Sequence, residues 1–105
     1  MFKVMFVLHE REGLSHADAL RYWRETHGPI AAGIPGCRRY VQSHAVAAPD
    51  GEPPFLGIAE LLFDDEASFG TAAQSAEFAA AIADLPNFCD AARLPTAFVE
   101  DHVIV

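Results

Sequence analysis

The chain has 105 residues, 51% of them hydrophobic, and carries 15 acidic against 7 basic side chains, for a formal net charge of −8 at pH 7. This balance lacks the clustered lysine and arginine that nucleic-acid backbones and anionic membrane surfaces attract, so we expect no nucleic-acid and no membrane partner. No apolar run approaches the roughly 18 residues that indicate a membrane span. The composition therefore predicts one globular domain, residues 1–105, with a cytoplasmic location.

The first predicted element is a strand over residues 2–8. Its side chains are apolar on both faces of the strand, with Lys3 as the one exception. A strand of this pattern is covered on both faces, so we expect it near the centre of a sheet. After a polar segment, Ser15 and Asp18 have the spacing of a capping box, because both side chains can accept hydrogen bonds from free backbone N–H groups. They predict a helix from Ser15 to about Thr26.

This helix continues an apolar stripe at three- and four-residue steps, formed by His16, Leu20, Trp23, His27 and Ile30. Gly28 and Pro29 are predicted to break or kink the helix, because proline lacks the N–H group and its ring clashes with the preceding turn. A short helical remnant through residues 31–32 is compatible with the sequence. His27 therefore lies at the end of a buried stripe, directly before a helix stop. It is either a hydrogen-bonded core residue or the polar floor of a pocket.

Three more strands and a second helical region follow. A strand is predicted over residues 37–47, with Arg38, Tyr40, Gln42 and His44 on one side, and a loop over 48–54 contains the Asp50-Gly51 turn. The third strand covers 56–63, and Asp64 is predicted to cap a helix that begins at residue 65. The helix restarts near Ser75 and is interrupted by Pro86, with a further helical stretch near 87–92 and a final strand over 96–105.

The order of these elements is β-α-β-β-α-β, which is typical of an α+β fold with a four-stranded antiparallel sheet and two helices on one face. The other face then has no cover from the same chain. Because the first strand is apolar on both sides, a second copy packed against the bare face is the simplest way to bury it, and we expect a homodimer.

The cysteine and histidine patterns give no indication of a metal or cofactor. Cys37 and Cys89 have neither CxxC spacing nor the density of a disulfide scaffold, so we interpret them as inert thiols. The five histidines include no HExxH pair, and no CxxCH haem-attachment motif is present. We therefore expect no metal and no cofactor. Glu100 and His102 share one face of the last strand and are interpreted as an interface or edge pair.

Four segments together resemble one known family: GLSHADALRYWRETHGPI (13–30), IPGCRRYVQSH (34–44), AELLFDDEASF (59–69) and ADLPNFCD (83–90). In this order and at this chain length they are similar to the EthD-like family of the dimeric α/β-barrel superfamily, named for a gene cluster of ethyl tert-butyl ether degradation. The resemblance implies a ferredoxin-like fold and a homodimer whose sheets face each other as a barrel. It also implies a cavity between sheet and helices in each subunit.

The resemblance selects four candidate site residues. His27 lies in an aromatic–x–x–x–His–x–Pro pattern with Trp23 and Pro29, and is implied as a catalytic residue together with Tyr40. Trp23, which a helical stripe more often places in the core, and His44 are candidates for ligand contact. Tyr40 and His44 lie about 13 Å apart along one strand face, so they can line one cavity but cannot share a proton.

Two functions remain open at this point. The first is a cofactor-independent enzyme that transfers a proton on a small apolar or aromatic molecule during isomerisation, cyclisation, dehydration or oxygenation, with His27 as the general acid or base. The second is a binding or accessory protein of a catabolic oxygenase system without chemistry of its own. The sequence contains no further catalytic constellation that would decide between them, because fold-level analogy does not choose a reaction.

Overall fold

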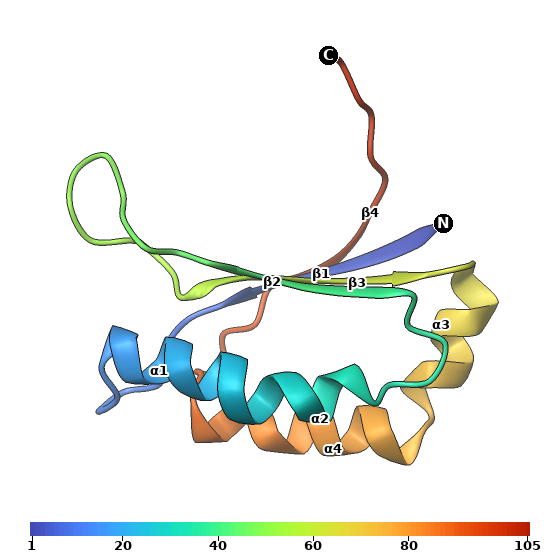
Figure 1. Ribbon diagram of the computed structural model, residues 1–105, viewed down its shortest axis with the longest axis horizontal. Coiled ribbons are helices and arrows are strands. Elements are labelled where there is room, and N and C mark those ends of the chain that lie inside the picture. The colour runs from blue at the N-terminus through green and yellow to red at the C-terminus, as the bar shows by residue number, and fades with distance from the viewer.

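A computed structural model describes all residues, 1–105, as one four-stranded antiparallel sheet with helices on one face (Figure 1). The strands are β1 (Phe2–Leu8), β2 (Arg39–His44), β3 (Gly57–Phe63) and β4 (Thr96–Val99). The helices are α1 (His16–Tyr22), the π-helical turn η1 (Trp23–His27), α2 (Gly28–Ala32), α3 (Glu66–Ala73), α4 (Ala76–Asp84) and the 3-10 turn η2 (Leu85–Asn87). The predicted α+β fold is confirmed. None of these helices is long and apolar enough to cross a bilayer.

The strand order is β2-β3-β1-β4, so β1 is an interior strand as predicted. It pairs with β3 from Phe2 opposite Phe63 to Leu8 opposite Gly57, and with β4 from Lys3 opposite Val99 to Phe6 opposite Thr96. Burial alternates strictly along β3, where every second residue is buried beneath the helices. This period of two separates an inner face, which packs on the helices, from an outer face.

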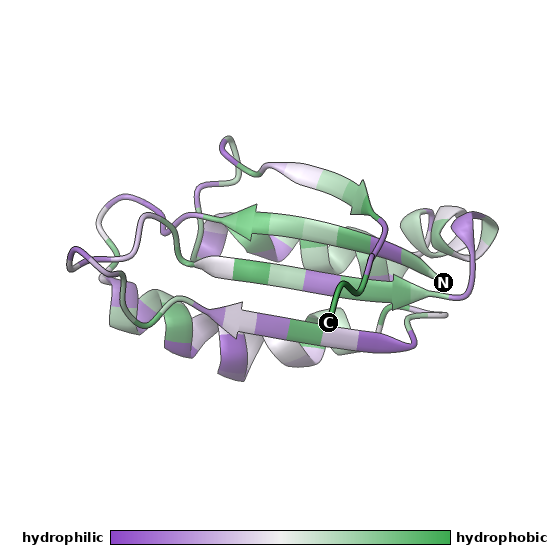
Figure 2. Cartoon of the chain, turned by 90° about the horizontal axis from the view of Figure 1, so that it is seen from above, coloured by the Kyte–Doolittle hydropathy of each residue, from purple (hydrophilic) through white to green (hydrophobic).

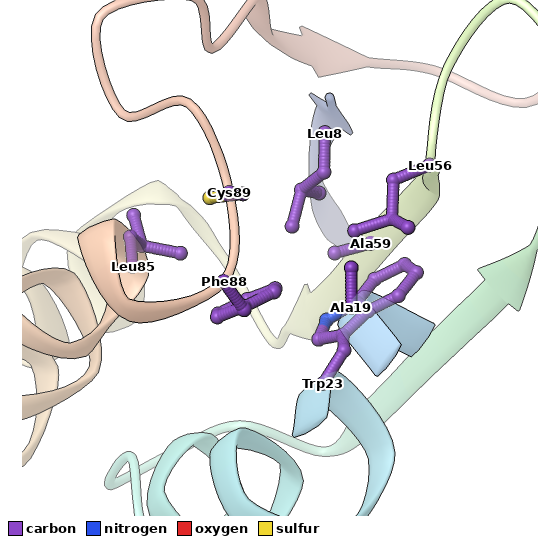
Figure 3. Close-up of a cluster of buried hydrophobic side chains, with 8 residues drawn as sticks. All are labelled: Leu8, Ala19, Trp23, Leu56, Ala59, Leu85, Phe88 and Cys89. Atoms are coloured by element: carbon purple, nitrogen blue, oxygen red, sulfur yellow. The ribbon is translucent and has the colours of Figure 1, made fainter. Parts of the chain in front are cut away.

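The hydrophobic core lies between the inner face and the helices, in two clusters. One cluster gathers around the indole of Trp23, which is completely buried, and contains Leu8, Ala19, Trp23, Leu56, Ala59, Leu85, Phe88 and Cys89 (Figure 3). The other contains Val4, Ala31, Ile34, Leu61, Phe63, Ala72 and Ala81. Both cysteines are free thiols, and burial raises the pKa of Cys89 to about 12, which keeps this thiol protonated and unreactive.

At Gly28-Pro29 the helix does not break, and the helical remnant through Ala31 and Ala32 that the sequence allowed is present as α2. The turn widens instead: the Gly28 N–H donates to the Trp23 carbonyl five residues earlier, which defines the π-helical turn η1. Pro29 then falls in the first turn of α2, where its missing N–H group has no cost. The proline is accommodated by the extra width of the π turn.

Other boundaries differ in detail. Ser15 and Ser75 cap α1 and α4 as expected, but the cap of α3 is Asp65, because Asp64 is held by two hydrogen bonds from Arg38. The predicted helical stretch at 87–92 is wrong, because the helix closes with η2 at Asn87 and residues 88–92 are not helical. The last strand ends at Val99, since residues 100–105 have no neighbouring strand to pair with.

The outer face carries no helix. Figure 2 views it directly and shows apolar segments interrupted by polar ones along the strands. By the strand alternation and register, this face carries Lys3, Met5, Val7, Arg39, Val41, Ser43, Ile58, Glu60, Leu62, Ala97 and Val99. None of these residues is fully buried within the chain.

Candidate functional site

A cavity of about 40 Å³ lies between the inner sheet face and the helices. Thirteen of its fourteen lining residues are hydrophobic, and the exception is His27. The lining is Phe6, Leu8, Trp23, His27, Ala31, Ile34, Tyr40, Ala59, Leu61, Phe78, Ala81, Ile82, Leu85 and Leu94. A single imidazole in an apolar chamber is the main chemical feature of the site.

His27 is the last residue of η1 and only 5% exposed. Its Nδ1 lies 2.8 Å from Oδ2 of Asp84, and this is the one hydrogen bond that the His27 side chain makes in the chain, so Nε2 has no partner. The ring of Phe88 packs against the imidazole with a centroid distance of 4.8 Å. The imidazole is therefore fixed on one side and free on the other, and it borders the cavity.

Asp84 ends α4 and receives three hydrogen bonds. Its Oδ1 accepts from the Tyr22 hydroxyl at 2.7 Å and from Asn87 Nδ2 at 2.9 Å, in addition to the bond between Oδ2 and His27. Burial raises the pKa of the carboxyl, but the hydrogen bonds from Tyr22, Asn87 and His27 outweigh burial and lower the pKa below its usual value. The carboxylate is thus ionised at neutral pH and accepts the proton of His27 Nδ1. That leaves Nε2 with a free lone pair in the neutral imidazole.

The π turn determines where His27 points. Successive residues of an α-helix are separated by about 100°, so the extra residue in η1 rotates everything after Trp23 relative to an uninterrupted helix. The Trp23 carbonyl accepts both from the Gly28 N–H and from Gln42 Nε2 at 2.9 Å. Gln42 thereby ties the widened turn to β2.

Tyr40 lies on β2, is partly buried and lines the same cavity as His27. Its hydroxyl accepts a hydrogen bond from Gln42 Nε2 at 2.7 Å. Burial raises the pKa of the phenol. Hydrogen bonds from the Gln42 and Trp23 side chains lower this pKa by less than burial raises it. The hydroxyl therefore keeps its proton at neutral pH and can donate it to an acceptor.

Trp23 also lines the cavity, but His44 does not. The His44 ring stacks on the indole with a centroid distance of 4.7 Å and an interplanar angle of 10°, and its Nε2 is 2.8 Å from Gln42 Oε1. Burial, Arg24 and His16 together lower the pKa of His44, so the ring is neutral at pH 7. His27, Tyr40 and Trp23 are thus brought together, and His44 is a support of the indole outside the cavity.

Sequence reasoning missed several residues that build the site. Asp84 lies 57 positions from His27, and its only signal is its place in the ADLPNFCD segment that resembles the EthD family. Gly57 is another: a Cβ atom there would lie 2.3 Å from the Ser43 carbonyl oxygen and 2.6 Å from the Trp23 ring. The indole fits under the sheet only because this position has no side chain.

The Glu100–His102 pair of the sequence analysis lies apart from the cavity. Glu100 Oε2 and His102 Nε2 are 3.1 Å apart, and both side chains are exposed beyond β4. No three histidine, cysteine or acidic side chains are grouped as metal ligands.

Comparison with known proteins places this chain in a family. The model of the EthD domain matches residues 11–92, which include His27, Tyr40 and Asp84. The chain belongs to the EthD family. An EthD family protein from Bacillus halodurans is similar in structure with a TM-score of 0.79 and 26% identity, covering 97% of this chain and 100% of that one. No functionally curated protein matches the chain.

More distant structures share the fold. A Dabb family protein from Mesorhizobium loti, described as ferredoxin-like, has a TM-score of 0.73 at 13% identity and covers 97% of both chains. A dimeric ferredoxin-like protein of unknown function from Thermobifida fusca has a TM-score of 0.72 at 13% identity, covering 93% of this chain and 88% of that one. These relatives of the EthD chain confirm the ferredoxin-like architecture.

Proposed function

We propose that this EthD family protein is a cofactor-independent enzyme that binds a small apolar or aromatic molecule in its cavity and transfers a proton on it. The observation that carries the proposal is the His27–Asp84 pair: Nδ1 is 2.8 Å from a carboxylate, and Nε2 is free beside an apolar chamber. A carboxylate that orients an imidazole and stabilises its charged form is a recurrent general-base arrangement. We further propose that residues 1–105 act as one domain in the cytoplasm, in a catabolic role.

In the proposed step, His27 Nε2 takes a proton from a C–H or O–H group of the substrate. The electron pair of the broken bond stays on the substrate, and the imidazolium that forms is stabilised by Asp84. The neutral hydroxyl of Tyr40 donates a hydrogen bond to the substrate oxygen on which negative charge develops. In an isomerisation the proton then returns from Nε2 to another substrate atom, and in a cyclisation the electron pair attacks a carbonyl carbon of the same molecule, whose oxygen takes the proton. In a dehydration the proton goes to the hydroxyl group that leaves as water, and in an oxygenation the substrate anion reacts with O2 as the co-substrate and oxidant.

The lining supports a neutral substrate. It contains no lysine and no arginine, so a carboxylate or phosphate would be desolvated without a partner cation. The cavity is smaller than the about 150 Å³ chamber that holds benzene in a well-studied protein, so a ring must displace lining side chains. Ile82 is 43% exposed and lines the cavity from α4, so it is the side chain best placed to move.

The test is a variant that keeps the hydrogen bond to Asp84 and removes the base. We expect His27→Asn to donate to Asp84 through its amide and to lower turnover by about 10²–10⁴-fold, which is the usual contribution of a general base. The matched control is His44→Asn, because His44 lies behind the indole and outside the cavity. Candidate substrates come from the genes beside this one, and a pH–rate profile identifies the ionisation on which turnover depends.

The second candidate function is a non-catalytic binding or accessory protein of an oxygenase system, which the predominantly apolar lining also supports. Retention of a candidate molecule without turnover would favour this function. Equal turnover by His27→Asn and the unsubstituted protein would contradict the general-base role of His27.

The proposal includes a homodimer formed through the outer sheet face, whose apolar residues no helix covers. The Thermobifida fusca relative is described as dimeric. Stable interfaces of this kind bury more than about 1,200 Å² in total, which is within reach of one face of a four-stranded sheet. Sedimentation at low micromolar concentration tests it, and a well-folded monomer would contradict it.

A further inference from the structure

The cavity comes close to the surface along one side of α4. Ile82 lines the cavity and is 43% exposed, so this side chain has the cavity on one side and solvent on the other. Phe78 lies one turn earlier on the same face of α4, is partly buried and also lines the cavity. Leu94, in the segment before β4, is a third lining residue that is partly exposed. We call Phe78, Ile82 and Leu94 the mouth of the cavity.

The inner face of the sheet continues past the cavity onto β4, where no helix covers it. Phe98 on β4 lies directly opposite Val4 on β1, and residues opposite each other in antiparallel strands point to the same face. Val4 is completely buried, whereas Phe98 is 60% exposed. Thr96, which lies opposite the cavity residue Phe6, is exposed as well. The helical cover therefore ends between β1 and β4.

Aromatic contacts join Phe98 to the mouth. The ring centroid of Phe98 lies 4.9 Å from that of Phe2 and 5.5 Å from that of Phe69 on α3. Phe69 in turn lies 6.1 Å from Phe78, and both Phe69 pairs have the edge-to-face geometry that aromatic rings prefer. An apolar surface therefore leads from the cavity past Phe78 to Phe98. None of the side chains along it is charged.

The size of the cavity gives this surface a role. At about 40 Å³ the cavity does not hold a ring until a lining side chain moves, and Ile82 at the mouth is the one with solvent behind it. Movement of Ile82 opens the cavity on the side where α4 meets solvent. A substituent of a ring bound beside His27 would then leave the cavity there, with the uncovered face of β4 as its next apolar surface.

We infer that the substrate carries a hydrocarbon tail, which leaves the cavity through the mouth and lies over Phe98. The inference rests on the proposed function and narrows its substrate class to neutral molecules with a proton-donating head at His27 and an apolar tail on β4. A polar or charged tail is disfavoured, because the mouth and the phenylalanine side chains beyond it offer no hydrogen-bond partner. Phe98 and Ile82 are then the residues that select for the length of the tail.

The test uses 4-alkylphenols as probes, with the hydroxyl group as the head and the alkyl chain as the tail. Calorimetric titration measures the dissociation constant. Trp23 is the single tryptophan and lines the cavity, so its fluorescence reports entry of the ring. We expect the dissociation constant to fall about two- to fourfold for each methylene from 4-ethylphenol to 4-hexylphenol, because each methylene leaves water for an apolar surface. No binding of 4-hexylphenol up to its solubility limit, or no gain beyond 4-ethylphenol, would overturn the inference.

Two substitutions locate the tail. Phe98→Ser removes the apolar surface on β4, and Ile82→Glu places a charge at the mouth. We expect each to reduce the preference for 4-hexylphenol over 4-ethylphenol by about tenfold or more. The matched control is Ala80→Glu, because Ala80 is exposed on the same helix but about 200° away from Ile82 around its axis.

Thermal unfolding verifies that each variant is folded. Ile82→Glu changes an exposed helix position, so it keeps the test decisive if the loss of the Phe98 contacts with Phe2 and Phe69 unfolds the edge strand. An unchanged preference for 4-hexylphenol in the folded variants would place the tail elsewhere and overturn the inference.

His27→Asn separates this inference from the proposed function. It removes the acceptor for the head, so we expect it to weaken all the alkylphenols by the same factor and to keep their dependence on chain length. If His27→Asn binds them as tightly as the unsubstituted protein, the role of His27 fails and the tail on β4 stands. If His27→Asn weakens binding while Phe98→Ser and Ile82→Glu keep the preference for long chains, the tail fails and the role of His27 stands.

Discussion

At the scale of single residues, the site depends on one histidine and on the groups that decide which of its nitrogens carries the proton. Asp84 is ionised because the three hydrogen bonds to its oxygens outweigh its burial. The ionised carboxylate holds the proton on Nδ1 of His27 and leaves Nε2 basic. The reactivity of His27 is thus set by a residue that does not itself line the cavity.

We predict that Asp84→Asn lowers the free energy of unfolding at neutral pH by about 2–3 kcal/mol, the usual value of a hydrogen bond to a charged group. The pKa of Asp84 is lower in the folded than in the unfolded chain. Its stabilisation is therefore complete above the unfolded-state pKa of about 3.9 and is lost as the pH falls through the folded-state pKa. Urea unfolding at several pH values should show that the difference in free energy of unfolding between the variant and the unsubstituted protein becomes smaller below about pH 4. A difference that stays the same at every pH would contradict the proposal that Asp84 stabilises the fold in its ionised form.

A second prediction at this scale concerns Gly57. We expect Gly57→Ala to destabilise the chain by about 2–4 kcal/mol, because the new Cβ would overlap the Ser43 carbonyl and the buried Trp23 ring. Thermal unfolding followed by tryptophan fluorescence measures both stability and the environment of the indole. Gly70→Ala is the control: a Cβ at Gly70 meets nothing within 4 Å, and alanine should stabilise α3 by about 0.5–1 kcal/mol.

At the scale of elements, the π turn and β2 form one unit. η1 widens the helix between α1 and α2, and Gln42 on β2 donates to its carbonyl at Trp23. The same amide donates to Tyr40 and accepts at Oε1 from His44. One side chain therefore joins the helix that carries His27 to the strand that carries Tyr40.

We predict that Gln42→Ala destabilises the chain by about 1–3 kcal/mol, because three partners lose a hydrogen bond in a partly buried place. Hydrogen exchange should show faster opening of η1 and α2 than of α4 in this variant. Ser43→Ala is the matched control, since Ser43 is the next residue of β2, faces the opposite side and makes no side-chain hydrogen bond. If the backbone amides of all helices lost protection against exchange equally, Gln42 would not stabilise η1 and α2 specifically.

At the scale of the whole molecule, the chain covers one side of its sheet and leaves the other uncovered. Helices cover the inner face, and the outer face carries apolar side chains around a few charged ones (Figure 2). Exposed apolar surface of this extent on a small protein usually marks an interface. The site and the interface therefore lie on opposite faces of the same four strands.

We predict that Met5→Lys separates the homodimer into folded monomers. Met5 lies on the outer face of the interior strand β1, opposite Glu60 and Ala97, so a lysine there would be desolvated on association. Sedimentation equilibrium should give a mass near 11.4 kDa for this variant. Val46→Lys adds the same charge to an exposed loop residue and should leave the dimer intact. If Met5→Lys stayed dimeric, the outer face would not be the interface.

The hydrophobic period and the capping residues of the sequence by themselves determined the element order, the interior position of β1 and the caps at Ser15 and Ser75. These features depend on neighbours within a few residues along the chain, which a pattern records directly. The stripe of the first helix also placed Trp23 and His27 on the buried side. The resemblance to the EthD family supplied Tyr40, which lines the same cavity.

Only the tertiary structure decided the chemistry of the site. Asp84, the hydrogen-bond partner of His27, lies 57 residues further along the chain. The helix continues through Pro29 because it widens into a π turn, whose Trp23 carbonyl accepts a hydrogen bond from Gln42 on β2. His44 shares a strand face with Tyr40 but turns to the back of the indole. Hydrogen bonds and ring contacts between distant segments leave no period in the sequence, because they depend on where the sheet brings those segments together.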